Sequence, residues 1–262
     1  MEALADALKI IGFESVLLPI DGEPTAPADV AVVDSYIYRA DDTKRFRAET
    51  IAAVDDLSRN LAVAIVVDPA PGATVKFHAA AHHALTGPEY ALVDPKLVDI
   101  QRAPVEGAVT RILVTTGGTD VDGYGYAIAH DLTKLLPSAT ISLVMGPWSS
   151  DQVPRQVNPI RTSSGLGNEL AISDLVVTAG GVTMLESLAL GRPTVAVLTA
   201  ENQQRYVEGA AAVNAVVPAS IDDAALAAVT LAGNADLRVE LAHRAANLID
   251  GRGALRVARA LT

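Results

Sequence analysis

The chain has 262 residues, half of them hydrophobic, and its 31 acidic and 20 basic side chains give a formal net charge of −11. This length suits one large domain or two α/β domains. An acidic chain without a basic tract is not expected to bind nucleic acid or an anionic membrane through charge. Because the chain has no cysteine, disulfides, thiolate catalysis and thiolate metal sites are excluded.

The first residues, Met1-Glu2-Ala3, have neither the basic run nor the apolar run of a signal peptide. No stretch of the chain approaches the roughly 20 apolar residues that a membrane-spanning helix needs. We therefore expect a soluble, cytoplasmic protein without a membrane span.

The first part of the chain, residues 1–106, alternates helical segments with short apolar strands. Glu2–Ile11 has one apolar helical face, and Gly12 is expected to end this helix. A second helix is expected between an N-cap at Asp41-Asp42 and Glu49. Strands are expected at 15–19, 30–33, 51–54 and 63–67, with another short one within 87–93, and Asp99–Gly107 is interpreted as a linker.

Three of these strands are followed by aspartates, which are Asp34, the pair Asp55 and Asp56, and Asp68. Aspartate is common in turns and at helix caps, and this alone can explain the pattern. Carboxylates at the carboxyl ends of parallel strands also face the crevice where α/β proteins bind ligands. Both interpretations stay open at this point, and neither identifies a reaction.

Three histidines, His78, His82 and His83, lie close together, and His78 and His82 are spaced for one face of a helix. A metal site would need a third ligand and a motif such as H-E-x-x-H, which this stretch lacks. We therefore expect exposed or capping histidines, and no metal site.

The second part of the chain, residues 107–262, repeats the alternation of strands and helices. Leu175-Val176-Val177 and Val195–Leu198 are apolar on both faces, as in a parallel sheet that helices cover on two sides. Strands are expected at 111–115, 141–145, 175–178, 194–198 and 216–217, with a short one near Ile160. Helices are expected at 123–136, 169–173, 182–190, 203–213, 222–231, 236–248 and 251–261.

Two glycine turns follow expected strands, Gly117-Gly118 and Gly180-Gly181. Glycines before a helix let an anion approach the backbone N–H groups at the positive end of the helix dipole. Glu186, in the helix after the second turn, can accept hydrogen bonds from paired hydroxyls such as those of a ribose. Alternatively, the turns are ordinary α/β connections and Glu186 only complements the helix dipole. The G-x-G-x-x-G motif of NAD-dependent enzymes, with an acid about 20 residues later, is absent.

Four segments together resemble the UDP-sugar hydrolases of the pseudaminic acid pathway and the related SpsG-like spore-coat polysaccharide proteins. They are Asp55–Arg59, Gly87–Val93, Ile112–Asp120 and Ser173–Gln203. The resemblance covers nearly the whole chain in order. It implies a GT-B fold with two Rossmann-like domains, 1–106 and 107–262, the first truncated at its first strand and the last helix reaching back to it. It also implies that the second domain holds UDP or a UDP-sugar, without a cofactor.

Position by position, the resemblance implies contacts of the second domain with the sugar nucleotide. The matching residues are Gly117, Gly118 and Thr119 near the diphosphate, Gly180, Gly181 and Thr183 at the second phosphate-side turn, Glu186 at the ribose, and Asn202 and Gln203 facing the sugar. In the first domain, Tyr36 matches a tyrosine of the family's active site.

The chain departs from this family where the catalytic histidine is expected. That histidine lies in a G-x-G-H-x-x-R loop before the helix that matches Glu2–Gly12, and this chain begins inside that helix. Ser35 and Leu61 stand where the family has two further histidines. Asp34 or Asp56 can act as the general base instead, since carboxylates activate water in glycoside hydrolysis. The absent first strand predicts a gap in the sheet, filled by closer strands, by upstream sequence, or by a second copy in a homodimer.

The sequence therefore predicts a protein that binds a UDP-sugar and hydrolyses or transfers its glycosyl group in surface-polysaccharide or modified-sugar biosynthesis. Its predicted catalytic residues are Tyr36, Asp34 and Asp56. The alternative is an inactive relative that acts as a partner subunit or as a sensor of sugar nucleotides, because the catalytic loop of the family is missing.

Overall fold

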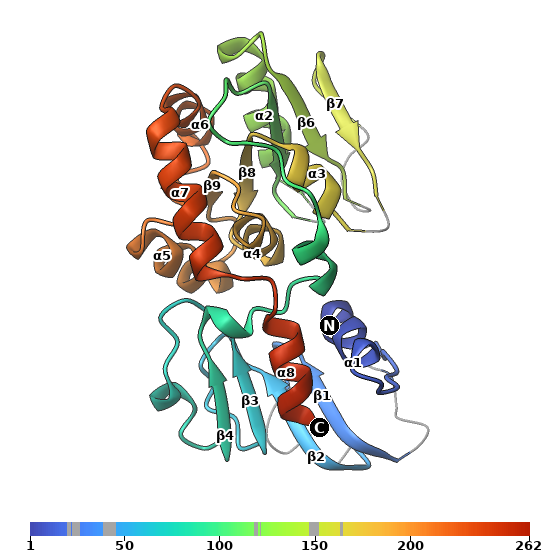
Figure 1. Cartoon of the computed structure of the whole chain (residues 1–262). Helices are drawn as coiled ribbons and strands as arrows, with labels where there is room; N and C mark the ends of the chain where they lie inside the picture. Colours follow the sequence, from blue (N-terminus) through green and yellow to red (C-terminus); the bar gives the residue numbers. More distant parts are fainter. Residues whose placement is uncertain are drawn as a thin grey trace. The chain divides into compact units, whose positions relative to one another are not determined.

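The computed structural model describes residues 1–19, 22, 27–38, 46–117, 120, 122–146, 152–162 and 165–262. The chain divides into two compact units (Figure 1), one formed by Met1–Pro95 together with Gly251–Thr262 and the other by Lys96–Asp250. Each unit contains one parallel sheet, so the predicted α/β class is confirmed.

The sheet of the first unit has four parallel strands in the order β1-β2-β3-β4. They are β1 (Ala28–Asp34), β2 (Ala48–Val54), β3 (Ile65–Asp68) and β4 (His83–Thr86). Each strand pairs with the next one along the chain, so the described sheet has no gap. This agrees with the alternative in which the remaining strands close ranks, and β1 lies at one edge of the described sheet.

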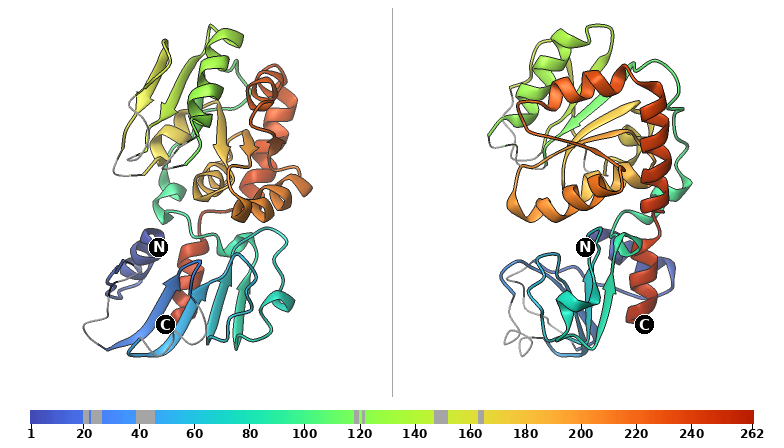
Figure 2. Two further views of the ribbon diagram at one scale, coloured as in Figure 1. Left: turned by 180° about the vertical axis from the view of Figure 1, so that it is seen from behind. Right: turned by 90° about the vertical axis from the view of Figure 1, so that its left-hand side faces the viewer.

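Two helices, α1 (Glu2–Ile10) and α8 (Gly253–Leu261), cover one face of this sheet and pack against each other (Figure 2). Their shared core with β2 and β3 contains Leu4, Ala7, Val54, Val67, Val257 and Leu261. The other face carries a smaller apolar cluster formed by Val33, Tyr38, Ala53, Leu61, Val63 and Val66. Gly12, with φ of +91°, follows α1 in the conformation that ends a helix.

The expected strand at 15–19 does not form. Residues 13–19 have no regular structure, and the side chains of Val16, Leu17 and Leu18 are exposed. An isolated apolar run gains the energy of a strand only when a neighbouring strand pairs with it, and no described strand pairs with this segment.

Two further expectations for the first unit are also wrong. Glu49 lies inside β2 rather than in a helix, because Ala48–Val54 pairs in register with β1, and Asp41 and Asp42 lie outside the described residues. The short strand expected within 87–93 is replaced by the 3-10 turn η3 (Pro88–Tyr90). The strand β4 was not expected, since its four residues show no alternation of apolar and polar side chains.

The sheet of the second unit has six parallel strands in the order β10-β9-β8-β5-β6-β7. They are β5 (Arg111–Thr115), β6 (Thr140–Val144), β7 (Val157–Ile160), β8 (Leu175–Ala179), β9 (Thr194–Val197) and β10 (Val217–Ala219). All of the strands expected in this part of the chain are confirmed. Every residue of β8 and β9 is buried, as expected for strands covered on both faces.

Helices flank this second sheet on both faces (Figure 2). They are α2 (Tyr124–Leu135), α3 (Gly167–Ile172), α4 (Val182–Ala189), α5 (Gln204–Ala212), α6 (Ala224–Ala232) and α7 (Ala235–Leu248). On one face of the sheet, α2, α6 and Leu241 of α7 form a buried apolar core with the strands. Across the described ranges, no helix has the length and apolarity that crossing a bilayer requires.

Two buried arginines fix the segment that leads into the second sheet. The guanidinium of Arg192 donates to the carbonyl oxygens of Ala103 (2.8 Å) and Ser173 (3.2 Å). Arg238 donates to the carbonyl oxygens of Gly107 (2.5 Å) and Ala232 (2.6 Å). The stretch expected to be a linker is therefore tied to the Lys96–Asp250 unit by charge-assisted hydrogen bonds.

Candidate functional sites at the strand ends

The two predicted glycine turns follow neighbouring strands of the second sheet. β5 and β8 are paired in parallel, with Thr115 opposite Thr178, so their carboxyl ends reach the same edge. Gly117 follows β5, and Gly180 and Gly181 follow β8. In open α/β sheets, ligands bind outside the carboxyl ends of the strands, which makes this edge the first candidate site.

The turn after β5 is organised by Asp120, a residue that sequence reasoning did not single out. Its Oδ1 accepts hydrogen bonds from Thr116 Oγ1 (2.6 Å) and from the backbone N–H of Gly125 (2.9 Å). A Cβ at Gly125 would lie 2.7 Å from Thr116 Oγ1, so the helix start needs glycine there. The carboxylate thus already caps the first turn of α2. Gly118 and Thr119, both predicted to contact the diphosphate, lie outside the described residues.

The turn after β8 is different, because the N-cap residue of the helix α4 that it opens is Gly181, which has no side chain. A Cβ at Gly180 would lie 2.4 Å from Val207 Cγ2, so glycine lets α5 pack close to this turn. A Cβ at Gly181 would meet nothing within 4 Å. Open space beside a helix N-terminus whose N-cap residue is glycine suits an anion that accepts from backbone N–H groups.

The other predicted binding residues of the second unit belong to α4 and to the loop after β9. Thr183 and Glu186 are both half-buried on α4. Gln203 ends the 3-10 turn η5 (Glu201–Gln203), and its Oε1 accepts from Thr199 N (3.2 Å) and Thr199 Oγ1 (3.0 Å). The side-chain amide oxygen of Gln203 therefore stabilises the conformation of its own loop. Asn202 lies in the same turn, half-buried.

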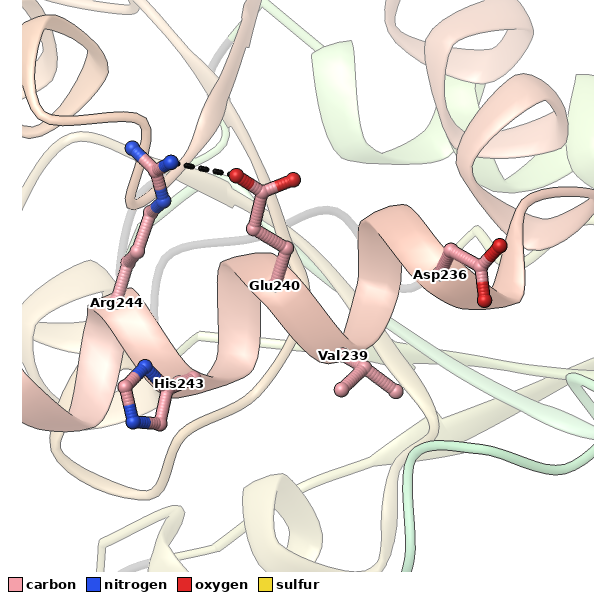
Figure 3. Close-up of a pocket in the computed structure, with 5 residues that line it drawn as sticks. All are labelled: Asp236, Val239, Glu240, His243 and Arg244. Atoms are coloured by element: carbon pink, nitrogen blue, oxygen red, sulfur yellow. Dashed lines mark hydrogen bonds and ion pairs between the residues drawn. The ribbon is translucent and has the colours of Figure 1, made fainter.

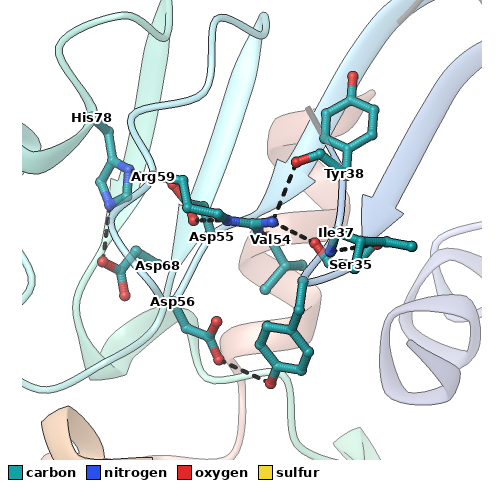
Figure 4. Close-up of polar contacts among 10 residues, drawn as sticks. Ser35, Ile37, Tyr38, Val54, Asp55, Asp56, Arg59, Asp68 and His78 are labelled. Atoms are coloured by element: carbon teal, nitrogen blue, oxygen red, sulfur yellow. Dashed lines mark hydrogen bonds and ion pairs between the residues drawn. The ribbon is translucent and has the colours of Figure 1, made fainter. Parts of the chain in front are cut away.

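The first unit carries a buried polar network at the carboxyl ends of β2 and β3 (Figure 4). The side chains of Asp55, Asp68 and His78 are fully buried. His78 Nε2 lies 2.9 Å from Asp68 Oδ2, and His78 Nδ1 faces Asp55 Oδ2 at 3.5 Å. The expectation of an exposed or capping histidine is wrong for His78, because the turn η2 (Val75–His78) folds back over the strand ends.

Arg59 joins this network to the loop after β1. Its Nε donates to Asp55 Oδ1 at 2.7 Å, and its Nη1 donates to the carbonyl oxygen of Ser35 at 2.6 Å. Its Nη2 donates to the carbonyl oxygen of Val54 at 3.2 Å. Sequence reasoning missed this role, although an arginine four residues after an aspartate at a strand end is the signal that could have found it.

The three predicted catalytic residues also come from these strand ends. Tyr36 Oη lies 3.5 Å from Asp56 Oδ2, at the long limit of a hydrogen bond. Burial raises the pKa of Asp56, and the nearby carboxylates Asp34 and Asp68 raise it further, while Arg59 and a backbone hydrogen bond oppose them. A carboxyl group with a raised pKa is suited to general acid–base chemistry.

A depression along α7 contains none of the predicted residues (Figure 3). It is lined by Asp236, Val239, Glu240, His243 and Arg244, and the Glu240–Arg244 ion pair lies across it. These side chains are mostly exposed on one helix, so we do not regard it as a ligand site. In the described ranges, no group of three or more His, Asp or Glu side chains is arranged to hold a metal ion.

No protein-family profile and no curated protein matches the chain. Several solved structures match it. MurG of Acinetobacter baumannii is 14% identical, with a TM-score of 0.56, over 85% of this chain and 75% of that one. WaaG, a glycosyltransferase involved in lipopolysaccharide biosynthesis, is 12% identical, with a TM-score of 0.55, over 100% of this chain and 94% of that one. The Streptomyces glycosyltransferase SsfS6, solved with thymidine diphosphate, is 16% identical, with a TM-score of 0.53, over 88% of this chain and 69% of that one.

The fold is GT-B-like. Its two Rossmann-like α/β units match those solved structures, which confirms the predicted fold. The chain spans about half the length of two other solved glycosyltransferases. It covers 44% of the glycosyltransferase of kitacinnamycin and 51% of CalG4, the calicheamicin glycosyltransferase. At these identities the similarity establishes the fold, and the activity must be argued from the residues.

Proposed function

We propose that this protein binds a UDP-sugar through its Lys96–Asp250 unit and hydrolyses or transfers the glycosyl group. The observation that carries the proposal is the N-terminus of α4, where the N-cap residue Gly181 has no side chain and a Cβ would meet open space. A diphosphate placed there would accept from backbone N–H groups and complement the helix dipole. The GT-B-like fold supports the proposal, as does the thymidine diphosphate bound to SsfS6.

We assign the remaining nucleotide contacts by the same reasoning. Gly117, Gly118 and Thr119 would line the other side of the diphosphate, and Glu186 would accept hydrogen bonds from the ribose hydroxyls. Thr183 would donate its hydroxyl to a phosphate oxygen. The turn that contains Asn202 and Gln203 would face the sugar.

The proposed chemistry uses the acidic strand ends of the first unit. The oxygen of water or of an acceptor hydroxyl forms a bond to the anomeric carbon while the bond from that carbon to the diphosphate oxygen breaks, so that UDP leaves with the electron pair. Asp56, in its ionised form, takes the proton of the attacking oxygen, with Tyr36 and Asp34 beside it. We propose that its functional relatives are the hydrolases of the pseudaminic acid pathway.

A second candidate function is a subunit or sensor that binds sugar nucleotides without turnover. The orientation of His78 favours it, because both ring nitrogens face buried carboxylates and neither can act as a base on a ligand. The two candidates share the nucleotide site and differ only in whether UDP is released. Incubation of the pure protein with UDP-N-acetylhexosamines, with released UDP measured by chromatography, distinguishes them.

Titration calorimetry with UDP tests the shared part of the proposal. We expect binding by the folded wild type, and Glu186→Ala should weaken it by about 1–3 kcal/mol because the ribose hydroxyls lose their acceptor. The matched control is Glu240→Ala, an exposed acid on α7 that should leave UDP binding unchanged. Folded protein that gives no heat with UDP or with any UDP-sugar would refute the proposal.

A further inference from the structure

The edge strand β1 differs from the other three edge strands of the two described sheets. It has seven residues, and its central stretch Val30–Val33 contains no charged side chain and no proline. The opposite edge strand of the same sheet, β4, has four residues, and the edge strands of the second sheet, β7 and β10, are short and contain Pro159 and Pro218. Short strands and prolines protect a sheet edge from pairing with another chain, and β1 lacks this protection.

The backbone of β1 directs donors and acceptors toward this edge. The N–H of Ala28 donates to the carbonyl oxygen of Arg47 at 3.0 Å, toward β2. Because successive residues of a strand direct their N–H and C=O groups to opposite sides, those of Asp29, Ala31 and Val33 point away from β2. Within the described ranges, no strand pairs with β1 on that side. A row of such groups along an apolar strand is a template for a further strand.

A stretch of exposed apolar side chains follows the helix that covers this part of the sheet. α1 packs on the face that carries Val30 and Val32, at the β1 end of the sheet (Figures 1 and 2). The apolar stretch, as we call it, begins in the last turn of α1, and its side chains are 48% to 82% exposed: Ile10, Phe13, Val16, Leu17 and Leu18. Large apolar side chains that gather on a surface indicate an interaction with another protein.

The pattern of β1 is self-complementary, which favours a second copy of the chain as the partner. Two copies related by a two-fold axis pair identical strands antiparallel. With Ala31 opposite its own copy, Asp29 lies opposite Val33 of the second copy, so all three outward-facing residues form hydrogen-bonded pairs. Asp34 then lies opposite Ala28, and no carboxylate directly faces another. A register displaced by one residue would place Asp29 opposite Asp34, where like charges repel.

We propose that the chain forms a two-fold symmetric homodimer in which β1 pairs antiparallel with β1 of a second copy, with Ala31 at the axis. The two four-stranded sheets then form one continuous sheet. Because the axis is perpendicular to this sheet, both α1 helices lie on the same face, and the two apolar stretches come to the same side of the interface. Their burial adds to the backbone hydrogen bonds between the strands. The interface involves no residue of the Lys96–Asp250 unit and is independent of the proposed nucleotide site.

Sedimentation equilibrium of the full chain tests the association. We expect a mass twice the 27.2 kDa of one chain. Leu17→Gln, in the apolar stretch, should weaken the dimer by about tenfold, because it removes exposed apolar area from the interface without touching the core. Leu226→Gln, an exposed leucine of α6 in the other unit, is the matched control and should leave the dimer unchanged. A monomer at every concentration would overturn the proposal and leave the edge to a different partner, and equal weakening by both substitutions would also overturn it.

Cysteine cross-linking tests the register. The chain has no cysteine, so Ala31→Cys introduces a single thiol. The Cα atoms of a hydrogen-bonded antiparallel pair lie about 5.5 Å apart, within the range of a disulfide. In Asp29→Cys, the matched control, the two thiols belong to residues offset by roughly 13 Å along the strands, which is too far for a disulfide. We expect oxidation to link the Ala31→Cys chains about ten times faster than the Asp29→Cys chains, although Asp29 is the more exposed residue.

Ala31→Pro tests the hydrogen bonds at the edge. The proline ring removes an N–H that points away from β2, so the strand can keep its pairing with β2 while the edge loses a donor. We expect a folded monomer, with folding checked by circular dichroism. If this variant does not fold, the cross-linking comparison decides alone. Equal cross-linking at residues 31 and 29 would overturn β1 as the interface, even for a chain that is a dimer, and would assign the dimer to another surface.

Discussion

His78 illustrates how a single residue can join three strand ends. Its ring lies between Asp55 and Asp68, all three side chains fully buried, and Arg59 extends the contact to the loop after β1. Removing one partner from such a buried network costs roughly 3–5 kcal/mol, because another charge stays buried without compensation. The network therefore gives the loops beside Asp56 a fixed conformation.

The raised pKa of Asp56 predicts a pH dependence of stability. A carboxyl group whose pKa in the folded state lies above its ordinary value of 3.8 favours the fold in its protonated form. That contribution is complete below pH 3.8 and is lost as the pH rises through the raised pKa. We expect Asp56→Asn, which cannot ionise, to exceed the wild type in stability at neutral pH and to match it below pH 3.8.

Urea unfolding at a series of pH values measures this difference directly. Asp131→Asn, in an exposed pair with Lys134, is the control for removing one carboxyl group from the chain. If the free energies of unfolding of Asp56→Asn and the wild type differed by the same amount at every pH, the pKa of Asp56 would not be raised by burial.

At the scale of elements, the two glycines before α4 have separate tasks. Gly180 allows β8 and α5 to come close, whereas Gly181 borders open space at the helix N-terminus. The sequence alone shows two adjacent glycines and cannot say which of them is needed for packing. That distinction depends on Val207 and Gln203, which are far along the chain from the turn.

Alanine substitutions separate these tasks. Gly180→Ala should lower the free energy of unfolding by about 1–3 kcal/mol, because its Cβ overlaps Val207 in a packed core. Gly181→Ala, with φ of −98° and no atom within 4 Å of its Cβ, should change stability little. Chemical denaturation compares the two variants, and similar losses in both would show that the close approach at Gly180 is not a constraint.

At the scale of the whole molecule, much of the second unit could be predicted from its sequence. Leu175–Val177 and Val195–Val197 are apolar on both faces, a local pattern that a doubly covered strand requires. The segment 15–19 shows the same kind of apolar run, but a strand also needs a partner, which local pattern does not reveal. The burial of His78 depends in the same way on contacts with residues 10 and 23 positions earlier in the chain.

The last helix completes the first unit, and its removal makes a prediction for the whole chain. A chain ending at Asp250 would expose Leu4, Ala7 and Val67, which share their core with α8. We expect amide hydrogen exchange to lose protection in β1–β4 while β5–β10 keep theirs, since the second core contains no residue of α8. Equal loss of protection in both sheets would show that the units do not fold separately.

One consequence concerns synthesis on the ribosome. The strands β1–β4 are translated before the second unit, yet the helix α8 that covers them, with Gly253 close to the backbone at Ala91, is translated after it. One side of the first sheet therefore stays uncovered until α8 has been synthesised, while the second unit can fold as soon as it leaves the exit tunnel. During translation, the second unit can thus complete its fold before the first.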